Sequence, residues 1–362
     1  IRDLVRSRGL GDVYKRQYAD TWGQQNGYEV EVIHQSPSVQ QFAQAVKSAE
    51  GPDAVVGIPN DQLADYVNAG LTAEVPAELY NDADFSEAAV QACYVDGKRY
   101  AAPLSVETTA LFYNTDMVEK VPATWEELVE QAVENGGVQF DATSIYYDLG
   151  FVRACGGYIF NYQNGAYDTS DIGLANDGAV QAYHFLDDLC NRYGLITADV
   201  TADIARSNFQ NGKCAYYIGG PWDIDGFTSA ETPFGITEMP TFHGQAFVTP
   251  VGTQVSFVGK DSDKQEPAWS FIKYLIENGA KDLYEAGDRI PARLSDQELE
   301  EIRENAYAKA FIVQINQGEP MPTVSEMGQL WSIHVNNIRS MWSGEQTPEA
   351  VSYTHLTLPT NR

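Results

Sequence analysis

Hydrophobic residues recur along the chain at two spacings, one typical of strands and one typical of helices. Residues 29–33 alternate polar and apolar side chains, which predicts a half-buried strand. Residues 54–58, 110–113 and 215–218 are short apolar runs, which predict buried strands. Between such strands, residues 182–193 carry apolar side chains at helical spacing. This alternation predicts an α/β protein with mostly parallel sheets flanked by helices.

Residue patterns typical of helix starts predict further helices in the rest of the chain. Thr124 and Glu127 have the spacing of a capping box, in which two side chains bond to the first backbone N–H groups. Ser295 and Glu298 have the same spacing and predict a second helix start. Apolar positions between residues 327 and 341 predict one long helix near the end of the chain.

Composition narrows the class of protein. The chain has 362 residues, of which 43% are hydrophobic, so it can bury a full core and form two domains. No stretch approaches the roughly 18–20 apolar residues of a spanning helix. The net charge is −28, which argues against nucleic acid as a partner because a phosphate backbone repels such a surface.

Motifs for metals, cofactors and catalysis are lacking in the sequence. The 4 cysteines form no CxxC pair, and the 5 histidines form no HxH or HExxH pattern. Four cysteines allow three disulfide pairings, between which the sequence does not decide, and free, mostly buried thiols are favoured. No nucleotide-binding glycine loop and no GxSxG are present. We therefore expect no metal, no cofactor and no catalytic residue.

Both ends of the chain differ from the middle in composition. Residues 1–17 carry 5 basic and 2 acidic residues, and residues 351–362 carry a net charge of +1. The middle, residues 18–350, has 17 basic and 49 acidic residues, a net of −32. A helix that starts at Thr347 would stop in the β-branched run after residue 352. These contrasts predict that both ends are non-native adapter or cloning sequence.

Several blocks of the sequence resemble the maltose/maltodextrin-binding proteins of ABC importers. They are GPDAVVGIPNDQLADYVNAGLTAEV (51–75), DGKRYAAPLSVETTALFYNTDMV (96–118), PATWEEL (122–128), ACGGYIFNYQNGAYDTSDIGLANDGAVQAYHFLDDL (154–189), GKCAYYIGGPW (212–222), FGITEMPTFHGQ (234–245) and QGEPMPTVSEMGQLW (317–331). Each block alone is common, but their shared order over residues 18–350 is specific to this carbohydrate-binding group.

The resemblance implies two α/β lobes joined by several crossing segments, with a ligand cleft between the lobes. It places the amino lobe at residues 18–106 and 253–302, and the carboxyl lobe at 107–252 and 303–350. The family's first strand should precede Tyr18, and it is missing from the matching part of the chain. A missing strand would expose the edges of its neighbours, so we expect lower stability and weaker binding than in an intact parent.

The resemblance also implies which residues bind the ligand. Sugars stack their C–H faces on aromatic rings and donate hydroxyl hydrogen bonds to carboxylates and amides. The matching aromatic positions are Trp222, Trp331, Tyr146 and Tyr147. Adjacent tyrosines cannot share one face, so we expect one to stack and the other to pack. The matching polar or cleft-edge positions are Asp61, Gln62, Glu107 and Met321.

Some positions depart from the family pattern. Residues 57–58 are Gly and Ile where the family often has Trp, and Gln62 stands where Arg is frequent. Ser144 replaces an acid, and Ser332 replaces a Tyr beside the predicted stacking Trp. These changes would alter individual subsites, so they leave the exact sugar open.

By this resemblance the chain is a non-catalytic solute-binding protein. It would capture malto-oligosaccharides outside the cytoplasmic membrane, in the periplasm or as a surface lipoprotein, and deliver them as a monomer to an ABC permease. One alternative is the same fold binding another oligosaccharide or a cationic solute, since aromatic rings also bind cations. A second alternative is a glycoside hydrolase with two carboxylates, which hydrolysis of a chromogenic maltoside would reveal.

Overall fold

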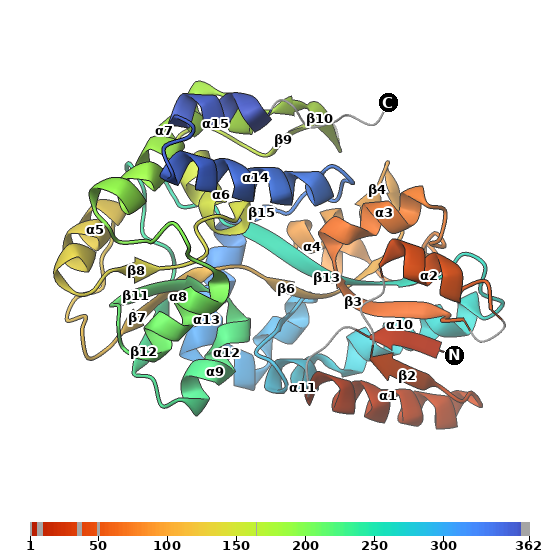
Figure 1. Ribbon diagram of the computed structural model, residues 1–362. Helices are drawn as coiled ribbons and strands as arrows, with labels where there is room; N and C mark the ends of the chain where they lie inside the picture. The colour runs from red at the N-terminus through yellow and green to blue at the C-terminus, as the bar shows by residue number, and fades with distance from the viewer. Residues whose placement is uncertain (1, 6–9, 35–37, 49–50, 164, 356–362) are drawn as a thin grey trace. The chain divides into compact units, whose positions relative to one another are not determined.

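Figure 1 shows the computed structural model, which describes residues 2–5, 10–34, 38–48, 51–163 and 165–355. The chain divides into two compact units, each built from separate segments. Unit 1 comprises Ile1–Glu107, Val251–Asn305 and Pro320–Ser325, and unit 2 comprises Thr108–Pro250, Ala306–Glu319 and Glu326–Arg362. The predicted boundaries at 106, 253 and 302 lie within 3 residues of these divisions. Residues 320–325 belong to unit 1, whereas the sequence analysis placed them in the carboxyl lobe.

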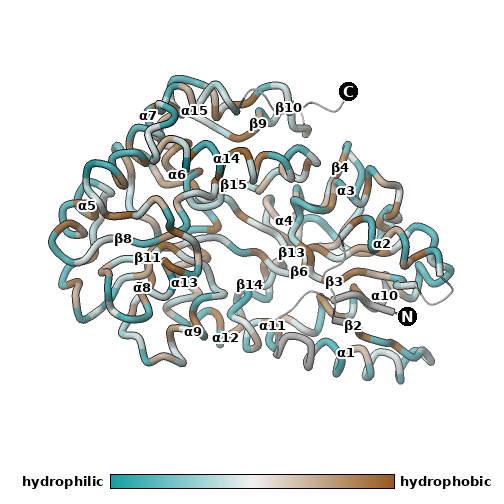
Figure 2. Tube along the Cα trace, in the orientation of Figure 1, coloured by the Kyte–Doolittle hydropathy of each residue, from teal (hydrophilic) through white to brown (hydrophobic). Residues whose placement is uncertain are grey.

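Unit 1 is organised around a seven-stranded sheet. Its strands follow the spatial order β14 (Ile290–Pro291), β6 (Ala102–Glu107), β13 (Pro250–Val258), β3 (Ala54–Pro59), β1 (Arg2–Val5) and β2 (Glu31–His34), and β15 (Glu319–Pro320) also pairs with β13. A separate hairpin consists of β4 (Tyr94–Val95) and β5 (Lys98–Arg99). The hydrophobic stretches in Figure 2 include β3, whose residues are almost all buried.

The sheets are mixed, so the prediction of mostly parallel sheets is wrong. In unit 1, β1 is parallel to β2 and β3, whereas β13 is antiparallel to β3 and β6, and β14 is antiparallel to β6. The reason lies in the segments that join the units. The chain leaves unit 1 through β6 and returns through β13, so these neighbours run in opposite directions, with Gly252 opposite Glu107.

Strand β1 occupies the place where the resemblance predicted a missing strand. It lies between β2 and β3, with Asp3 opposite both Val32 and Ala54. This pairing corrects the expectation of an incomplete sheet, because ladder hydrogen bonds use backbone groups that almost any sequence supplies. The foreign origin of residues 1–17 stays a prediction, and positions 1 and 6–9 lie outside the described residues.

Helices cover the sheet of unit 1. They are α1 (Leu10–Asn26), α2 (Val39–Ala45), α3 (Leu63–Asn68), α4 (Glu87–Gln91), α10 (Gln265–Asn278), α11 (Ala280–Glu285) and α12 (Glu300–Arg303), with 3-10 turns η1 (Asn60–Gln62), η2 (Asp82–Asp84) and η6 (Leu294–Glu298). Helix α1 packs against β2, α10 and α11. Its Trp22 ring lies 5.5 Å from Tyr28 and 5.7 Å from Phe271, which ties the helix to the core.

Unit 2 contains a smaller sheet and more helices. Its strands are β12 (Phe234–Thr237), β7 (Ala110–Asn114), β11 (Tyr216–Gly219) and β8 (Val138–Gln139) in spatial order, with a hairpin of β9 (Phe160–Gln163) and β10 (Ala166–Ile172). The helices are α5 (Trp125–Glu134), α6 (Ile145–Ala154), α7 (Asp177–Asp187), α8 (Ala202–Gln210), α9 (Ile224–Ser229), α13 (Ala306–Gln317), α14 (Met327–Trp342) and α15 (Pro348–Thr354). The short segments are the π-helix η4 (Asp188–Arg192) and the 3-10 turns η3 (Gly173–Ala175) and η5 (Pro221–Asp223). Only the β8–β11 pair is parallel among the described strands of this sheet.

The last described helix packs into unit 2. Helix α15 contacts α7 and α14, which lie beside it in Figure 1. Its Val351 and the following His355 are fully buried. The helix therefore continues to Thr354, beyond the point where the β-branched run predicted it to fail. Residues 356–362 lie outside the described part, and the foreign origin of 351–362 stays a prediction.

Of the two helix starts predicted from capping-box spacing, the one at Thr124 is confirmed and the one at Ser295 is not. The Thr124 hydroxyl accepts from the Glu127 backbone N–H at 3.1 Å, so α5 begins as predicted. The Glu127 carboxylate, however, accepts from Ala123 N, one residue before the cap. The start predicted at Ser295 is wrong, because residues 294–298 form the 3-10 turn η6 and α12 begins later, after Leu299.

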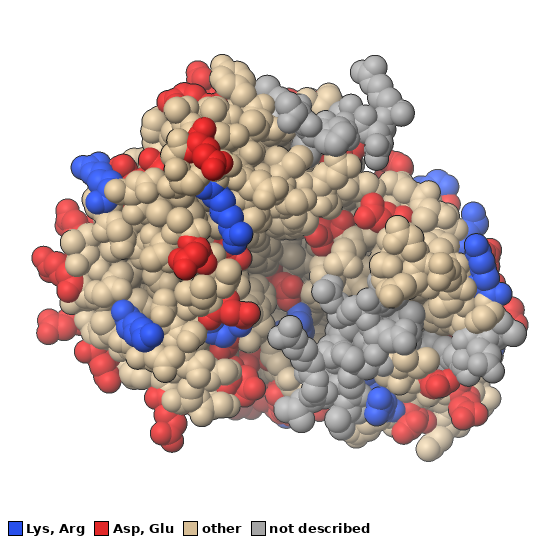
Figure 3. All heavy atoms as spheres, viewed as in Figure 1, with Lys and Arg blue, Asp and Glu red and all other residues tan. Residues whose placement is uncertain are grey.

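Surface charge and thiols complete the description. Acidic side chains are spread over the face shown in Figure 3 and outnumber the basic ones on it. All four cysteines are free, and two of them, Cys93 and Cys214, are buried. Among the described residues, none of the helices combines the length and apolar character needed to cross a bilayer.

Candidate functional site

Three of the predicted aromatic residues come together in unit 2. The Tyr146 ring lies 5.8 Å from the Tyr147 ring and 6.2 Å from the Trp222 ring, measured between centroids. Tyr146 and Tyr147 stand at the start of α6, and Trp222 stands on η5, directly after β11. We call these three residues the aromatic cluster.

The two tyrosines of the cluster differ in their surroundings. Helix α6 begins after Ser144, whose hydroxyl accepts from the Tyr146 backbone N–H at 3.4 Å. Burial and the nearby carboxylates of Asp223 and Asp141 raise the pKa of Tyr147, so its hydroxyl stays protonated. The Tyr147 ring also lies 6.5 Å from Phe140, and both tyrosines are half-buried.

Trp222 remains exposed because the loop before it is made of glycine. Its side chain is 37% exposed, which is unusual for so large an apolar ring. A Cβ atom on Gly220 would lie 2.3 Å from that ring, and one on Gly219 would lie 2.2 Å from the Tyr217 ring. The glycine pair is thus required by close approach, since it lets the indole fold back over the backbone.

A buried carboxylate holds this loop in place. Asp223 is 1% exposed, and its Oδ1 accepts from Arg206 Nε at 2.6 Å. Its Oδ2 accepts from the Tyr217 hydroxyl at 2.9 Å and from Gly220 N at 3.2 Å. Burial raises the pKa of Asp223 even though Arg206 opposes that shift. Asp223 positions Trp222, and sequence reasoning did not single it out, although it follows the GGPW motif directly.

A second buried carboxylate follows the two tyrosines. Asp148 is fully buried on α6, and its Oδ2 lies 3.1 Å from Nε2 of His334 on α14. His334 Nδ1 lies 3.2 Å from His355 Nε2, and His355 Nδ1 lies 2.9 Å from the Val351 carbonyl oxygen. The other Asp148 oxygen, Oδ1, has no hydrogen-bond partner in the described structure. The sequence analysis did not predict this cluster of Asp148, His334 and His355, because Asp148 lies far from the two histidines in the sequence.

Two further predicted residues, Trp331 and Met321, lie in different units and differ in burial. Trp331 lies half-buried on α14 in unit 2. Met321 belongs to unit 1, where it is 3% exposed and its backbone N–H donates to the Val251 carbonyl. Its side chain is therefore buried in this structure, and its place at the edge of a ligand cleft stays a prediction.

In unit 1, Asp61 and Gln62 lie on η1, directly after β3, and both are partly exposed. The neighbouring Asn60 is buried and fixes the turn. Its Nδ2 donates to the Met321 carbonyl and to Thr323 Oγ1, both at 2.8 Å, and its Oδ1 accepts from Thr253 N at 3.0 Å. Asn60 thus joins three chain segments beneath the predicted residues, a role that the sequence pattern did not indicate.

Glu107 ends β6 and already has strong partners within unit 1. One carboxylate oxygen accepts from Gln254 Nε2 at 2.9 Å, and the other is ion-paired with Arg289. Its side chain is only 15% exposed. Glu107 is therefore held in one orientation, and a ligand hydroxyl would have to share an oxygen that Arg289 or Gln254 already contacts.

Two departures from the family pattern have structural explanations. Gly57 has a φ of 79° and sits at the register shift between β3 and β13, where a larger residue would be strained. Ser144, which replaces an acid, serves as the cap of α6. Among the described residues no group of three His, Cys, Asp or Glu side chains could hold a metal ion. The arrangement suits stacking on an apolar ligand face with nearby hydrogen-bonding groups.

Comparisons with known proteins agree with this description. The family described as "Bacterial extracellular solute-binding protein" matches residues 17–310. A galactooligosaccharide-binding protein of Bacillus subtilis (strain 168) is 30% identical over 313 residues, which cover 83% of this chain and 74% of that protein. A maltooligosaccharide ABC transporter solute-binding lipoprotein of Streptococcus pneumoniae (strain ATCC BAA-255 / R6) is 26% identical over 329 residues, 86% of this chain and 76% of that protein.

Solved structures show the same architecture. The maltose-maltodextrin binding protein of Alicyclobacillus acidocaldarius superposes with a TM-score of 0.90 at 30% identity, covering 99% of each chain. A cyclo/maltodextrin-binding protein complexed with maltotetraose superposes with a TM-score of 0.90 at 26% identity, covering 99% of this chain and 96% of the other. The predicted two-lobed α/β fold is therefore confirmed at the level of the fold family.

Proposed function

Because this chain belongs to the bacterial extracellular solute-binding protein family, we propose that it binds malto-oligosaccharides through the aromatic cluster of unit 2. The main support for this proposal is the exposed Trp222 ring, which lies beside the Tyr146 ring. Sugar rings present C–H faces that stack on aromatic rings, and Trp222 and Tyr146 together offer two such rings side by side. The names of several relatives and solved neighbours, which mention maltooligosaccharides or maltodextrin, support this choice of ligand.

A galacto-oligosaccharide is the second candidate ligand. The relative with 30% identity carries that name, and it is more similar in sequence than the maltooligosaccharide-binding relatives at 26% and 28%. Both sugars would stack on the same rings, so the aromatic cluster does not separate them. The polar residues around it would decide, since a buried polar group that is built for one hydroxyl pattern rejects another.

The rest of the proposal concerns how the protein works. It delivers the sugar to the membrane subunits of an ABC transporter, acts outside the cytoplasmic membrane as a monomer, and performs no chemistry on its ligand. The family description and the lipoprotein relatives support the transport role and the place outside the cytoplasmic membrane. Asp61, Gln62 and Glu107 of unit 1 and Trp331 of unit 2 contribute further contacts to the sugar in this proposal.

Isothermal titration calorimetry tests the ligand and the site together. Maltotriose should bind the intact chain in the micromolar range, and Trp222→Ala should weaken binding about tenfold or more through lost stacking and area burial. Tyr353→Ala is a matched control, because Tyr353 is an exposed aromatic residue of unit 2 that is remote in sequence from the cluster. Equal affinities of both variants would contradict the proposed site.

A ligand panel separates the two sugars. Stronger heat with a galacto-oligosaccharide of equal length than with maltotriose would move the assignment to the second candidate. Release of nitrophenol from p-nitrophenyl maltoside at a rate that follows protein concentration would instead contradict the non-catalytic proposal.

A further inference from the structure

The chain contains several Asn–Gly pairs, which differ in how their reactive groups are held. Four lie in the described part, at residues 26–27, 135–136, 211–212 and 278–279, and a fifth, at 164–165, includes a position outside it. In such a pair the glycine backbone nitrogen can attack the asparagine side-chain carbon Cγ, because glycine has no Cβ to hinder the approach. The attack requires a free side-chain amide, a free glycine N–H and a peptide group that can rotate.

Three of the described pairs stand at helix ends where the asparagine side chain is already bonded. Asn26, Asn211 and Asn278 each donate from Nδ2 to the backbone carbonyl oxygen four residues earlier, at 2.8, 2.7 and 2.8 Å. In the last two pairs the glycine N–H is bonded as well, to the carbonyl oxygens of Phe209 at 2.9 Å and Leu275 at 2.8 Å. These hydrogen bonds must open before the glycine nitrogen can reach Cγ.

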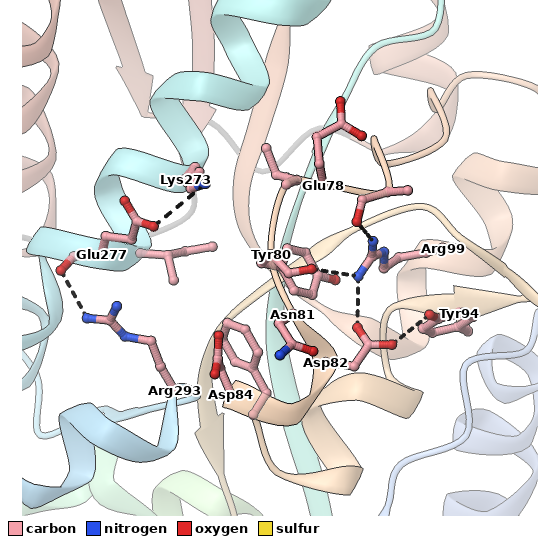
Figure 4. A pocket seen from close by; sticks show the side chains of 14 residues that line it. Glu78, Tyr80, Asn81, Asp82, Asp84, Tyr94, Arg99, Lys273, Glu277 and Arg293 are labelled. Atoms are coloured by element: carbon pink, nitrogen blue, oxygen red, sulfur yellow. Dashed lines mark hydrogen bonds and ion pairs between the residues drawn. The ribbon is translucent and has the colours of Figure 1, made fainter.

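The end of α10 has a further anchor, which Figure 4 shows. Arg293 Nη2 donates to the carbonyl oxygen of Glu277, the residue before Asn278, at 3.0 Å. Arg293 is itself fixed, because it donates to both carboxylate oxygens of Asp296, at 2.8 and 2.7 Å. The backbone just before this Asn–Gly pair is therefore held from outside the helix as well as from within it.

The pair at the end of α5 lacks such contacts. Within the described residues, the Asn135 side chain, the Asn135 carbonyl and the Gly136 N–H form no hydrogen bond to another residue. The fixed bonds lie on either side, from Asn135 N–H to Gln131 O at 3.0 Å and from Gly137 N–H to Ala132 O at 2.8 Å. Gly136 is exposed. The peptide group between Asn135 and Gly136 can therefore rotate while the helix stays in place.

We propose that Asn135 is a modification site, where the folded protein deamidates faster than at Asn26, Asn211 or Asn278. The Gly136 nitrogen gives up its proton to solvent and attacks Cγ of Asn135, so a new N–C bond forms. The bond between Cγ and the side-chain nitrogen breaks, and ammonia leaves with a proton from solvent. Water then adds to either carbonyl of the cyclic imide, which yields aspartate or isoaspartate at this position.

Both products should weaken the end of α5. A carboxylate at the C-terminal end of a helix faces the negative end of the helix dipole, which is unfavourable. Isoaspartate also lengthens the backbone just before Gly137, whose carbonyl oxygen accepts from the N–H groups of Ala215 and Tyr216 at 3.2 and 3.3 Å. Tyr216 begins β11, the strand that leads to the loop of Trp222. The modification should therefore lower the stability of unit 2, whichever ligand the protein binds.

Peptide mapping by mass spectrometry tests the proposal on the folded chain, incubated at mildly alkaline pH. Each deamidation replaces NH2 by OH, and an isoaspartyl methyltransferase labels the isoaspartate product. Asn135 should react about tenfold or more faster than Asn211 and Asn278, because their hydrogen bonds must first open. In urea these bonds are lost, so the rates should converge. Equal rates in the folded chain, a faster reaction at Asn26, or a difference that persists in urea would overturn the proposal.

A variant tests the effect of the modification on stability. Asn135→Gln should react far more slowly, because its longer side chain closes a less favourable ring, and the backbone φ of −119° suits either residue. After the same incubation the thermal midpoint of the parent chain should fall, whereas that of Asn135→Gln should match its own fresh sample. Asn211→Gln is the matched control and should lose as much on incubation as the parent. An equal loss by Asn135→Gln would refute the role of Asn135.

Discussion

Two buried aspartates in unit 2 stand directly after the aromatic residues proposed to bind sugar, and they are stabilised in opposite ways. Asp223, after Trp222, has an arginine, a tyrosine hydroxyl and a backbone N–H as partners. Asp148, after Tyr147, has a histidine on one oxygen and, within the described part of the chain, no hydrogen-bond partner on the other. The first arrangement suits an ionised carboxylate, and the second does not.

Counting protons shows which form Asp148 takes. His355 Nδ1 donates to the Val351 carbonyl, so in the neutral ring His355 Nε2 is an acceptor. His334 Nδ1 must then donate to it, which leaves His334 Nε2 as an acceptor facing Asp148. Only a protonated Asp148 can donate to that nitrogen while both rings stay neutral.

The pKa shifts point the same way. Burial raises the pKa of Asp148 well above its usual value, while burial lowers the pKa of His334 well below its own and that of His355 to about 4. The comparison teaches that a carboxylate stays charged in this core where a fixed cation meets it, as Arg206 meets Asp223. Where only imidazoles are available, the cluster remains neutral by keeping a proton on the acid.

The largest expected effect comes from removing the cation of the charged pair. Arg206→Met should lower the free energy of unfolding by about 3 kcal/mol, because Asp223 would be left buried with an uncompensated charge. It should also weaken maltotriose binding, since Asp223 positions the loop of Trp222. Urea denaturation measures the first effect and calorimetry the second.

Arg192→Met is the control for that loss. Arg192 is also ion-paired with an aspartate in unit 2, but its side chain is 65% exposed, so its removal should cost far less stability than the removal of Arg206. If the two variants lost the same stability, the charged form of Asp223 would not be the element that holds the loop.

The next effect distinguishes the two aspartates by pH. Asp148→Asn keeps a donor toward His334 Nε2 and removes a group whose folded pKa is raised. A raised pKa costs stability as the pH rises above about 4, because the unfolded carboxyl ionises and the folded one does not. The variant should therefore become more stable than the parent chain between pH 5 and pH 8, by about 1 kcal/mol or more at the upper end.

The histidines give the parent chain a slope of the opposite sign at low pH. Their lowered pKa values mean that the unfolded chain binds more protons between about pH 6.5 and pH 4, so stability should fall as the pH falls through that window. Asp148→Asn should still lose stability as the pH falls through this window, and the midpoints of urea denaturation at several pH values would show it. A gap between variant and parent that stays constant from pH 5 to pH 8 would mean that Asp148 is ionised in the fold.

A smaller effect tests the loop without touching any charge. Gly220→Ala would bring a Cβ to 2.3 Å from the Trp222 ring, which must then move. The backbone φ of −118° suits alanine, so stability should change little, while maltotriose affinity should fall about three- to tenfold. Gly226→Ala is the matched control, because a Cβ there meets nothing within 4 Å. Unchanged affinity of Gly220→Ala would separate the indole position from sugar binding.

How much of this could be predicted from the sequence depends on how local each feature is. The order of strands and helices and the Trp222 loop followed from short motifs, because turns and amphipathic stripes are written in neighbouring residues. The pairing of Arg206 with Asp223 spans 17 residues, and that of His334 with Asp148 spans 186. Such partners depend on how helices pack, so no spacing rule could have brought them together.

The errors have the same origin. Antiparallel pairing of β6 and β13 arises from segments about 150 residues apart that join two units, which alternation of strands and helices does not reveal. Helix α15 continues into the β-branched run that predicted its end, because the helix packs against α7 and α14. In each case tertiary contacts overrode a local pattern that was correctly identified.

The smallest predicted effect adds a third carboxylate, this time at the partly exposed start of α6. Ser144→Asp restores the acid that the family pattern favours and keeps a side chain able to cap the helix. A negative charge at a helix start is favourable, so the free energy of unfolding should rise by about 0.3–0.5 kcal/mol at pH 7 and return to the parent value below about pH 4. Urea denaturation at both pH values would show this, with maltotriose affinity changed less than about threefold. A loss of stability at pH 7 would mean that repulsion from Asp141 and Asp223 outweighs the attraction of the helix terminus. A carboxylate beside the aromatic cluster would then require a fixed cation even near the surface.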